Sequence, residues 1–216
     1  MKETIKNALI LFVITLVAGA LLGIVYEVTK EPIRVQKALA EQRANQEAYP
    51  SATFTEYEAF DKAEADAILA GDENYAKVSI DDVKVAEIGG APVGYVLQIT
   101  SMGYGDDITW TLGITNEGQV NGISLISINE TPGLGMNAEK VLVPQFDDVD
   151  IPPSLFTVIR STDTLPETID AISGATITTR AITNGVNAGL AYYEQVLSGS
   201  DLTGSLSDSD DGKEVS

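Results

Sequence analysis

A run of small and hydroxyl-bearing residues, "DAISGATITTR" at 170–180, has the residue types and spacing to do chemistry. Gly174 and Ala175 carry little side-chain bulk and come directly before Thr176, where an extended segment gives way to a helical pattern. The first N–H groups of a helix lack intrahelical partners and carry partial positive charge, so a phosphate can approach them closely. The run therefore fits a place where an anionic group is held or covalently attached. In the alternative interpretation, Ser173 or Thr176 is only the N-cap of an ordinary helix.

The composition limits which chemistry this chain can do by itself. It has no cysteine and no histidine, so disulfides, thiolate metal sites and the commonest general base are excluded. Any redox chemistry must therefore come from an added cofactor. Lys and Arg number 13 against 32 Asp and Glu, for a net charge of -19. This balance lacks the basic footprint that nucleic acids require, so we expect no nucleic-acid partner, and solubility is the simplest role of the charge.

Two further loops are rich in glycine. Within "NETPGLGMN" at 129–137, residues 131–133 suit a type II turn, and Gly133 and Gly135 leave room for a flat ligand against the backbone. The sequence "GYG" at 103–105 likewise precedes a strand-like pattern. Glycine turns between strands are common. Three such loops in one small domain are nevertheless more than hairpins need, which favours a ligand site.

Taken together, "ETPGLG" and, about 40 residues later, "DAISGAT" resemble the FMN-binding domain of the electron-transport subunits RnfG and NqrC. These subunits belong to the Rnf ferredoxin–NAD complex and to the sodium-pumping NADH:quinone reductase. In that family the last threonine of the D-x-x-S/T-G-A-T pattern is joined to FMN through a phosphoester. The resemblance, which covers roughly residues 5–197, thus implies covalent FMN on Thr176. The other residues of the pattern in this chain are Asp170, Ser173, Gly174 and Ala175.

The resemblance also implies two loops that face the flavin. The loop against the isoalloxazine is made by Glu130, Thr131, Pro132, Gly133, Leu134 and Gly135. The second ligand-facing loop is made by Gly103, Tyr104 and Gly105. Leu134 and Tyr104 are the expected neighbours of the ring, although each side chain would fit a core position equally well. No catalytic residue and no metal ligand is expected in this chain, because the flavin supplies the redox chemistry.

The function implied is that of an electron-transfer subunit, which passes electrons through FMN within an Rnf-type ion-translocating ferredoxin:NAD oxidoreductase. Its partners would be the other membrane subunits of that complex and, during maturation, a separate flavin transferase that uses FAD and a divalent metal. The short chain favours RnfG over NqrC. Two alternatives remain open: a stand-alone FMN protein for extracellular electron transfer, and a non-redox anchored binding module in which "SGAT" is only a helix cap.

The N-terminal region reads as a membrane anchor. Residues 7–26 carry no charge, and about 20 such residues make a helix of roughly 30 Å, the hydrocarbon thickness of a bilayer. The alternative is a signal peptide cleaved after Ala18-Gly19-Ala20, but the apolar run continues to Val25, which favours an uncleaved anchor.

The orientation of this anchor rests on two conflicting indications. Two lysines precede the span, and four basic residues follow it by residue 43, which weakly favours a cytoplasmic C-terminal domain. The family places this domain outside the cytoplasm. We follow the family and expect a single-pass cell-membrane protein with an extracytoplasmic flavin domain.

We expect an α+β fold with an antiparallel sheet and flanking helices. The predicted regions are the N-terminal end and anchor at 1–29, a helical stalk at 30–72 with a second helix at 55–69, the FMN-binding domain at 73–197, and a disordered acidic tail at 198–216. The predicted strands of the domain are 83–88, 93–99, 108–114, 120–128 and 155–160, and its predicted helices are 135–145 and 178–197.

Overall fold

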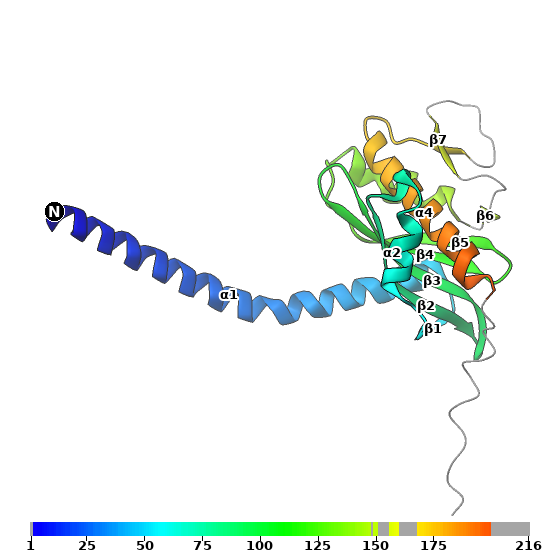
Figure 1. The fold of residues 1–216 in the computed structure, drawn as a ribbon, viewed down its shortest axis with the longest axis horizontal. Coiled ribbons are helices and arrows are strands. Elements are labelled where there is room, and N and C mark those ends of the chain that lie inside the picture. Colours follow the sequence, from blue (N-terminus) through cyan, green and yellow to red (C-terminus); the bar gives the residue numbers. More distant parts are fainter. Residues whose placement is uncertain (1, 148, 151–155, 160–167, 200–216) are drawn as a thin grey trace, which may run out of the picture. The chain divides into compact units, whose positions relative to one another are not determined.

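The computed structural model describes residues 2–147, 149–150, 156–159 and 168–199 (Figure 1). The chain divides into two compact units, 1–42 and 43–216. The first unit holds most of α1 (Lys2–Ala48), and the second holds the last turns of α1 together with an α+β domain. The domain unit therefore begins well before the boundary expected at 73.

Helix α1 is continuous from the predicted anchor into the predicted stalk, with Pro32 inside it. Its apolar part has no buried residue, and the helix is long and apolar enough to cross a membrane by length and composition. Only near its C-terminal end, at Ala44, Asn45 and Ala48, are side chains buried.

Within the described residues the domain is built on a six-stranded sheet, and its antiparallel pairing confirms the predicted antiparallel sheet; each strand pairs with the next along the chain. The strands are β1 (Thr53–Glu56), β2 (Val78–Ile88), β3 (Ala91–Met102), β4 (Asp107–Thr115), β5 (Gln119–Ser127) and β6 (Val149–Asp150). The hairpin between β2 and β3 turns at Gly89 and Gly90, whose φ angles are 62° and 82°. Two consecutive positive φ angles are what a tight two-residue hairpin requires, and glycine adopts them without strain.

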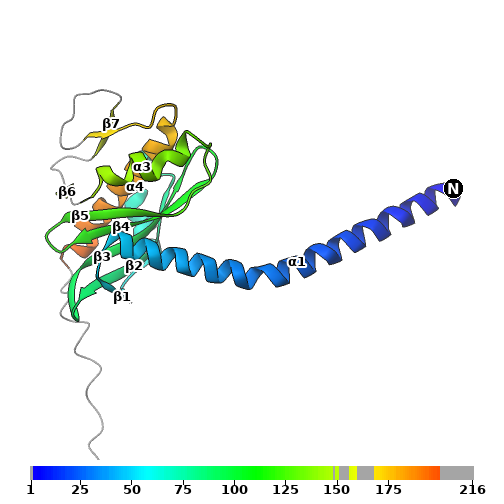
Figure 2. The same ribbon diagram turned by 180° about the vertical axis from the view of Figure 1, so that it is seen from behind.

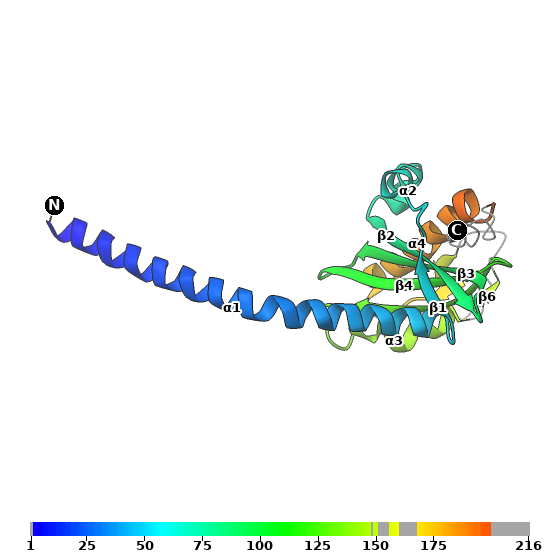
Figure 3. The same ribbon diagram turned by 90° about the horizontal axis from the view of Figure 1, so that it is seen from below.

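Helices α2 (Lys62–Leu69) and α4 (Thr176–Tyr192) cover one face of this sheet (Figures 1 and 3). The predicted alternation in β4 is confirmed, because Ile108, Trp110, Leu112 and Ile114 are all fully buried beneath these helices. Gly185 lets α4 approach the sheet closely, since a Cβ there would lie 2.6 Å from Trp110 Cζ2. The core therefore lies between this sheet face and the two helices.

The opposite face of the sheet receives the end of α1, from Arg43 onward. Thr111 Oγ1 donates a hydrogen bond to Asn45 Oδ1 (3.3 Å), and Ser124 Oγ donates one to Glu47 Oε2 (2.6 Å). A Cβ added at Gly113 would lie 2.4 Å from the carbonyl oxygen of Ala48. The last turns of α1 are therefore a packed part of the domain.

The segment predicted as a second helix at 55–69 is only partly helical. Residues 53–56 instead form β1, which pairs antiparallel with β2. β-Branched and aromatic residues such as Thr53, Phe54 and Thr55 favour a pleated surface. Helix α2 starts later, after Asp61, whose side chain accepts a hydrogen bond from Ala63 N as an N-cap.

The remaining elements are short. They are the 3₁₀ helices η1 (Glu73–Tyr75), η2 (Gly135–Asn137) and η3 (Val143–Gln145), helix α3 (Ala138–Val141), the parallel pair β7 (Thr157–Ile159) and β8 (Thr168–Asp170), and the π-helical segment η4 (Tyr193–Leu197). The helix predicted at 135–145 is thus broken into three, with Pro144, which has no N–H to donate, near the start of the last piece. Of the strand predicted at 155–160, Leu155 and Arg160 lie outside the described residues, as do most of the predicted tail, residues 200–216. Figure 2 shows α3, β6 and β7 from behind.

Candidate functional site

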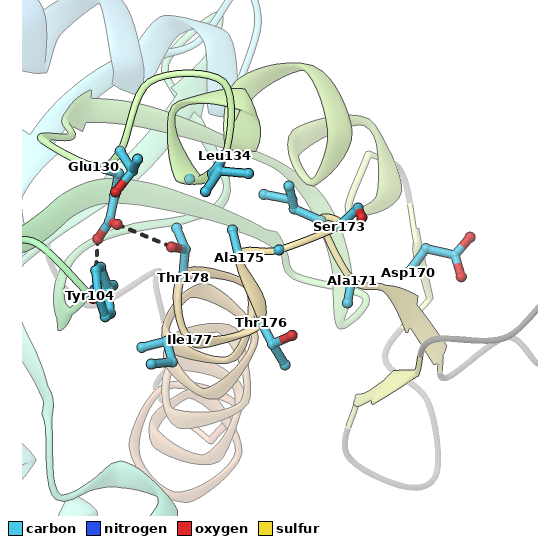
Figure 4. Close-up of a pocket in the computed structure, with 14 residues that line it drawn as sticks. Tyr104, Glu130, Leu134, Asp170, Ala171, Ser173, Ala175, Thr176, Ile177 and Thr178 are labelled. Carbon is cyan, nitrogen blue, oxygen red and sulfur yellow. Dashed lines mark hydrogen bonds between the residues drawn. The ribbon is translucent and has the colours of Figure 1, made fainter.

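A large pocket lies where the three predicted loops meet the head of α4. Its volume is about 1080 Å³, just above the roughly 300–1,000 Å³ typical of cofactor and small-molecule sites. The residues that line it are Tyr104, Glu130, Thr131, Leu134, Gly135 and the segment 170–178 (Figure 4). All three motifs singled out in the sequence therefore converge on one cavity.

The "SGAT" segment forms a tight turn that leads into α4. Ala175 N donates to Ile172 O at 2.9 Å, and Gly174 between them has a φ of 77°. This left-handed conformation favours glycine. The N-cap position is Ala175, and no side chain caps it. The interpretation of Ser173 or Thr176 as the N-cap is therefore wrong: Ser173 is exposed in the turn, and Thr176 is the first residue of the helix.

The head of α4 carries three threonines in very different surroundings. Thr178 and Thr179 are 1% and 0% exposed. Thr178 Oγ1 donates to Glu130 Oε2 (3.2 Å), and Thr179 Oγ1 donates to Ala175 O (3.0 Å). Thr176 is partly exposed and lines the pocket. Of these three threonines, Thr176 is the one with exposed surface on the pocket wall.

The loop after β5 adopts the predicted turn. Leu134 N donates to Thr131 O at 3.1 Å, and Gly133 between them has a φ of 77°. A Cβ at Gly133 would meet no atom within 4 Å, so the space beside it is open. Pro132 and Gly133 shape the turn without forming part of the pocket wall.

Leu134 brings this loop onto the "SGAT" turn. Its side chain is 38% exposed and lines the pocket, and a Cβ added at Gly174 would lie 3.0 Å from Leu134 Cδ2. Tyr104 is 70% exposed on the pocket wall. The sequence also allowed a core position for each of these side chains, and neither belongs to the core.

Gly135 and Gly103 have a different role from the one expected. A Cβ at Gly135 would lie 2.7 Å from Glu130 Cβ, and a Cβ at Gly103 would lie 2.1 Å from Glu130 Oε1. The space beside each glycine is therefore filled by the Glu130 side chain and is not left for a ligand. Gly105 similarly lies close to Asn129, since its Cβ would be 2.9 Å from the Asn129 carbonyl oxygen.

Asp170 ends β8 and lies on the pocket wall, yet its carboxylate points away from Thr176 (Figure 4). Its backbone is held by Gln145, whose Oε1 accepts from Asp170 N at 2.8 Å. Within the lining residues of the described structure, Asp170 and Glu130 are the charged ones. No lysine or arginine of this described wall is thus available to hold a phosphate by charge.

Sequence reasoning missed four lining residues: Ala171, Ile172, Ile177 and Thr178. A signal existed for Ile177, which is 53% exposed and does not fit the apolar spacing of Ile182 and Val186. The role of Thr178 depends on a partner 48 residues away and left no local signal.

The fold and site define a class of protein, an FMN-binding domain that follows a long apolar helix. The sequence matches the FMN-binding domain family over residues 103–191 and the RnfG N-terminal region over residues 1–47. It is 32% identical over 196 residues, 90% of this chain and 94% of the relative, to the G subunit of the Na(+)-translocating ferredoxin:NAD(+) oxidoreductase complex of Acetobacterium woodii. The chain therefore belongs to the RnfG family, which confirms the resemblance.

Other relatives agree with this assignment. The G subunit of the proton-translocating ferredoxin:NAD(+) oxidoreductase complex of Clostridium ljungdahlii is 39% identical over 106 residues, 49% of this chain and 56% of the relative. The G subunit of the ion-translocating oxidoreductase complex of Methanosarcina acetivorans is 28% identical over 194 residues, 88% of this chain and 95% of the relative. The crystal structure of Shewanella oneidensis NqrC shares the fold, with a TM-score of 0.52 at 14% identity over 74% of this chain and 95% of that one.

Proposed function

We propose that this protein is a membrane-anchored electron-transfer subunit of an Rnf-type ion-translocating oxidoreductase, with FMN linked covalently to Thr176. The observation that carries the proposal is the contrast among the threonines at the head of α4. Thr176 is partly exposed on the pocket wall, whereas Thr178 and Thr179 are buried, at 1% and 0% exposed. Family membership supplies the chemical identity of the group.

The residues of the pocket fit a tethered flavin. The cavity of about 1080 Å³ has room for a flat three-ring system beside Leu134 and Tyr104. A phosphate on Thr176 would stand at the first turn of α4, where helix N–H groups offset negative charge. Because the described residues of the wall include no lysine or arginine, retention of the cofactor is better explained by a covalent bond than by charge pairing.

The flavin supplies the redox chemistry, and this chain supplies its position and surroundings. Thr176 holds the phosphate end at the helix, and Leu134, packed on Gly174, provides an apolar surface for the ring. Tyr104 lies at the pocket wall on the side of the β3–β4 loop, where its exposed ring can shield one edge of the flavin from water.

The same proposal includes the anchor and the partners. Helix α1 would cross the cell membrane once and place the flavin domain outside the cytoplasm. The flavin would exchange electrons with neighbouring membrane subunits of the complex. A separate flavin transferase would attach the FMN, and the partial exposure of Thr176 on the pocket wall supports access by that enzyme.

The test is the intact mass of the full chain, extracted from membranes after co-expression with a flavin transferase, followed by peptide mapping. We expect one FMN-sized addition on the peptide that contains Thr176, and none in Thr176→Ala. Thr183→Val is the matched control: it removes a buried threonine hydroxyl of the same helix that lies away from the pocket wall, and it should keep the addition. An unmodified wild-type chain, beside a control substrate that the same transferase does modify, would refute the proposal.

A further inference from the structure

We propose that Glu130 is a positioning residue for the flavin: its buried carboxylate fixes the Tyr104 loop to the helix that carries Thr176, and its negative charge lowers the flavin's reduction potential. This inference rests on the proposed function, because it concerns the same pocket. It adds a residue that acts on the cofactor through the loops that surround it.

The Glu130 side chain joins three segments that are far apart in the sequence. Its Oε1 accepts hydrogen bonds from Tyr104 N (2.7 Å) and Gly105 N (3.2 Å), and its Oε2 accepts one from Thr178 Oγ1 (3.2 Å). Figure 4 shows Glu130 between Tyr104 and Thr178, with both contacts drawn. Thr178 lies two positions after Thr176, so one carboxylate sets the spacing between the attachment helix and the loop that carries the Tyr104 ring.

The two loops are shaped to hold this side chain. A Cβ at Gly103 would lie 2.1 Å from Glu130 Oε1, and a Cβ at Gly135 would lie 2.9 Å from Oε2. Both distances are shorter than non-bonded contacts allow. The absence of side chains at Gly103 and Gly135 is therefore a condition for the buried position of Glu130, a residue that is 6% exposed.

The charge of this carboxylate is not balanced by an ion pair. In the part of the chain that the structure describes, Glu130 forms none with lysine or arginine. Its three partners are neutral groups, two of them backbone N–H donors, so none of them offsets a negative charge on the carboxylate with a positive one. Reduction adds electrons to the flavin, so a fixed anion beside the pocket disfavours the reduced form, most strongly at low local dielectric.

Substitution by glutamine separates the charge from the geometry. The amide oxygen of a glutamine can accept from Tyr104 N and Gly105 N, and its NH₂ group can donate to the Thr178 hydroxyl oxygen. Glu130→Gln should therefore keep the loops in place and remove only the charge. Glu130→Ala should remove both.

The first experiment measures the midpoint potential of the flavinylated full chain by spectroelectrochemistry. We expect a higher potential in Glu130→Gln than in the wild type. The matched control is Glu117→Gln, which removes one charge at the β4–β5 turn, the opposite end of β4 from the pocket. An unchanged potential in Glu130→Gln, or an equal rise in Glu117→Gln, would overturn the electrostatic role.

The second experiment needs no flavin and follows amide hydrogen exchange in the unmodified full chain. Exchange at Tyr104 N and Gly105 N should accelerate by at least tenfold in Glu130→Ala and remain slow in Glu130→Gln. Unchanged exchange at both amides in Glu130→Ala would overturn the positioning role. A chain that never acquires FMN would refute the proposed function instead, and the exchange measurement would still decide whether Glu130 holds the loop.

Discussion

Gly174 shows how a single residue shapes the pocket. Its φ of 77° lies in the left-handed region, and Leu134 Cδ2 lies 3.0 Å from where a Cβ would be. An alanine there must adopt an unfavourable backbone conformation and also displace Leu134, the residue proposed to face the flavin ring. With FMN on Thr176 as proposed, stability and cofactor attachment would therefore be coupled at this position.

We expect Gly174→Ala to destabilise the domain by about 1–2 kcal/mol and to reduce the flavinylated fraction. Thermal unfolding can be followed by the fluorescence of Trp110, the single tryptophan, which is fully buried. Gly90→Ala is the matched control, because Gly90 also has a positive φ of 82° but sits in the β2–β3 turn with open space around it. A normal flavinylated fraction in Gly174→Ala would contradict the coupling.

Tyr192 is a second residue whose surroundings affect stability, in this case its dependence on pH. It is fully buried, and its hydroxyl has no hydrogen-bond partner among the described residues. Burial raises the pKa of Tyr192 from 10.0 to about 12, and nearby Glu64, Tyr57 and Asp61 add to the rise. The unfolded chain therefore ionises this tyrosine at a lower pH than the folded chain does. Its ionisation leaves the free energy of unfolding unchanged below pH 10 and lowers it as the pH rises toward 12.

We expect Tyr192→Phe to be as stable as the wild type or more stable at pH 8, because the substitution removes an unsatisfied buried hydroxyl. Between pH 10 and 12 the wild type should lose roughly 2–3 kcal/mol more than the variant. Urea unfolding at several pH values, read by Trp110 fluorescence, measures the difference. Equal losses of stability in the two proteins between pH 10 and 12 would contradict the raised pKa of Tyr192.

At the scale of elements, the end of α1 belongs to the domain, although its sequence reads as a stalk. Asn45 and Glu47 bond to Thr111 and Ser124 on the sheet, and Tyr49 donates to Val93 O at 2.8 Å. Tyr49 also packs with Ala52, Ala86 and Val96 in a small apolar cluster on this face. The domain therefore depends on residues ahead of the predicted boundary at 73.

A chain that starts at residue 43 should accordingly be more stable than one that starts at residue 50. We expect a difference of about 2 kcal/mol or more, from the lost packing of Tyr49 and the lost contacts of Asn45 and Glu47. In the longer chain, Gly113→Ala should reproduce part of the loss, because its Cβ would lie 2.4 Å from Ala48 O. Gly122→Ala should destabilise the domain less, because the nearest atom to its Cβ would lie 3.4 Å away. Equal stability of the two chains would show that the helix end is dispensable.

The sequence could predict elements whose signal is local and repeated. The alternation in β4 and the spacing of four residues between Ile182, Val186 and Leu190 are such signals, and both elements are present. Strand β1 has only four residues and exists through its pairing with β2, a distant partner. The contacts of Glu130 likewise join positions 26 and 48 residues apart, so its place in the motif was predictable but its role was not.

At the scale of the whole molecule, the distribution of basic residues and the family resemblance give opposite expectations for the side of the membrane on which the domain lies. Two lysines precede the apolar span, and four basic residues follow it by residue 43, which favours a cytoplasmic domain. Acidic residues contribute little to that rule, so Glu27 and Glu31 do not reverse it. The resemblance to the family gives the opposite expectation, because it implies a flavin domain outside the cytoplasm. Chemical labelling of cysteines introduced on either side of the span distinguishes the two orientations.

The absence of cysteine makes that measurement simple. Ser198→Cys introduces one thiol at an exposed position after the domain, and Lys2→Cys introduces one ahead of the apolar span. With a membrane-impermeant maleimide on cells whose cytoplasmic membrane is intact, we expect Ser198→Cys to be labelled and Lys2→Cys to be labelled only after permeabilisation. The reverse pattern would place the domain in the cytoplasm. In that case the charge distribution would have decided the topology, and any FMN on Thr176 would have to be attached by an enzyme on that side.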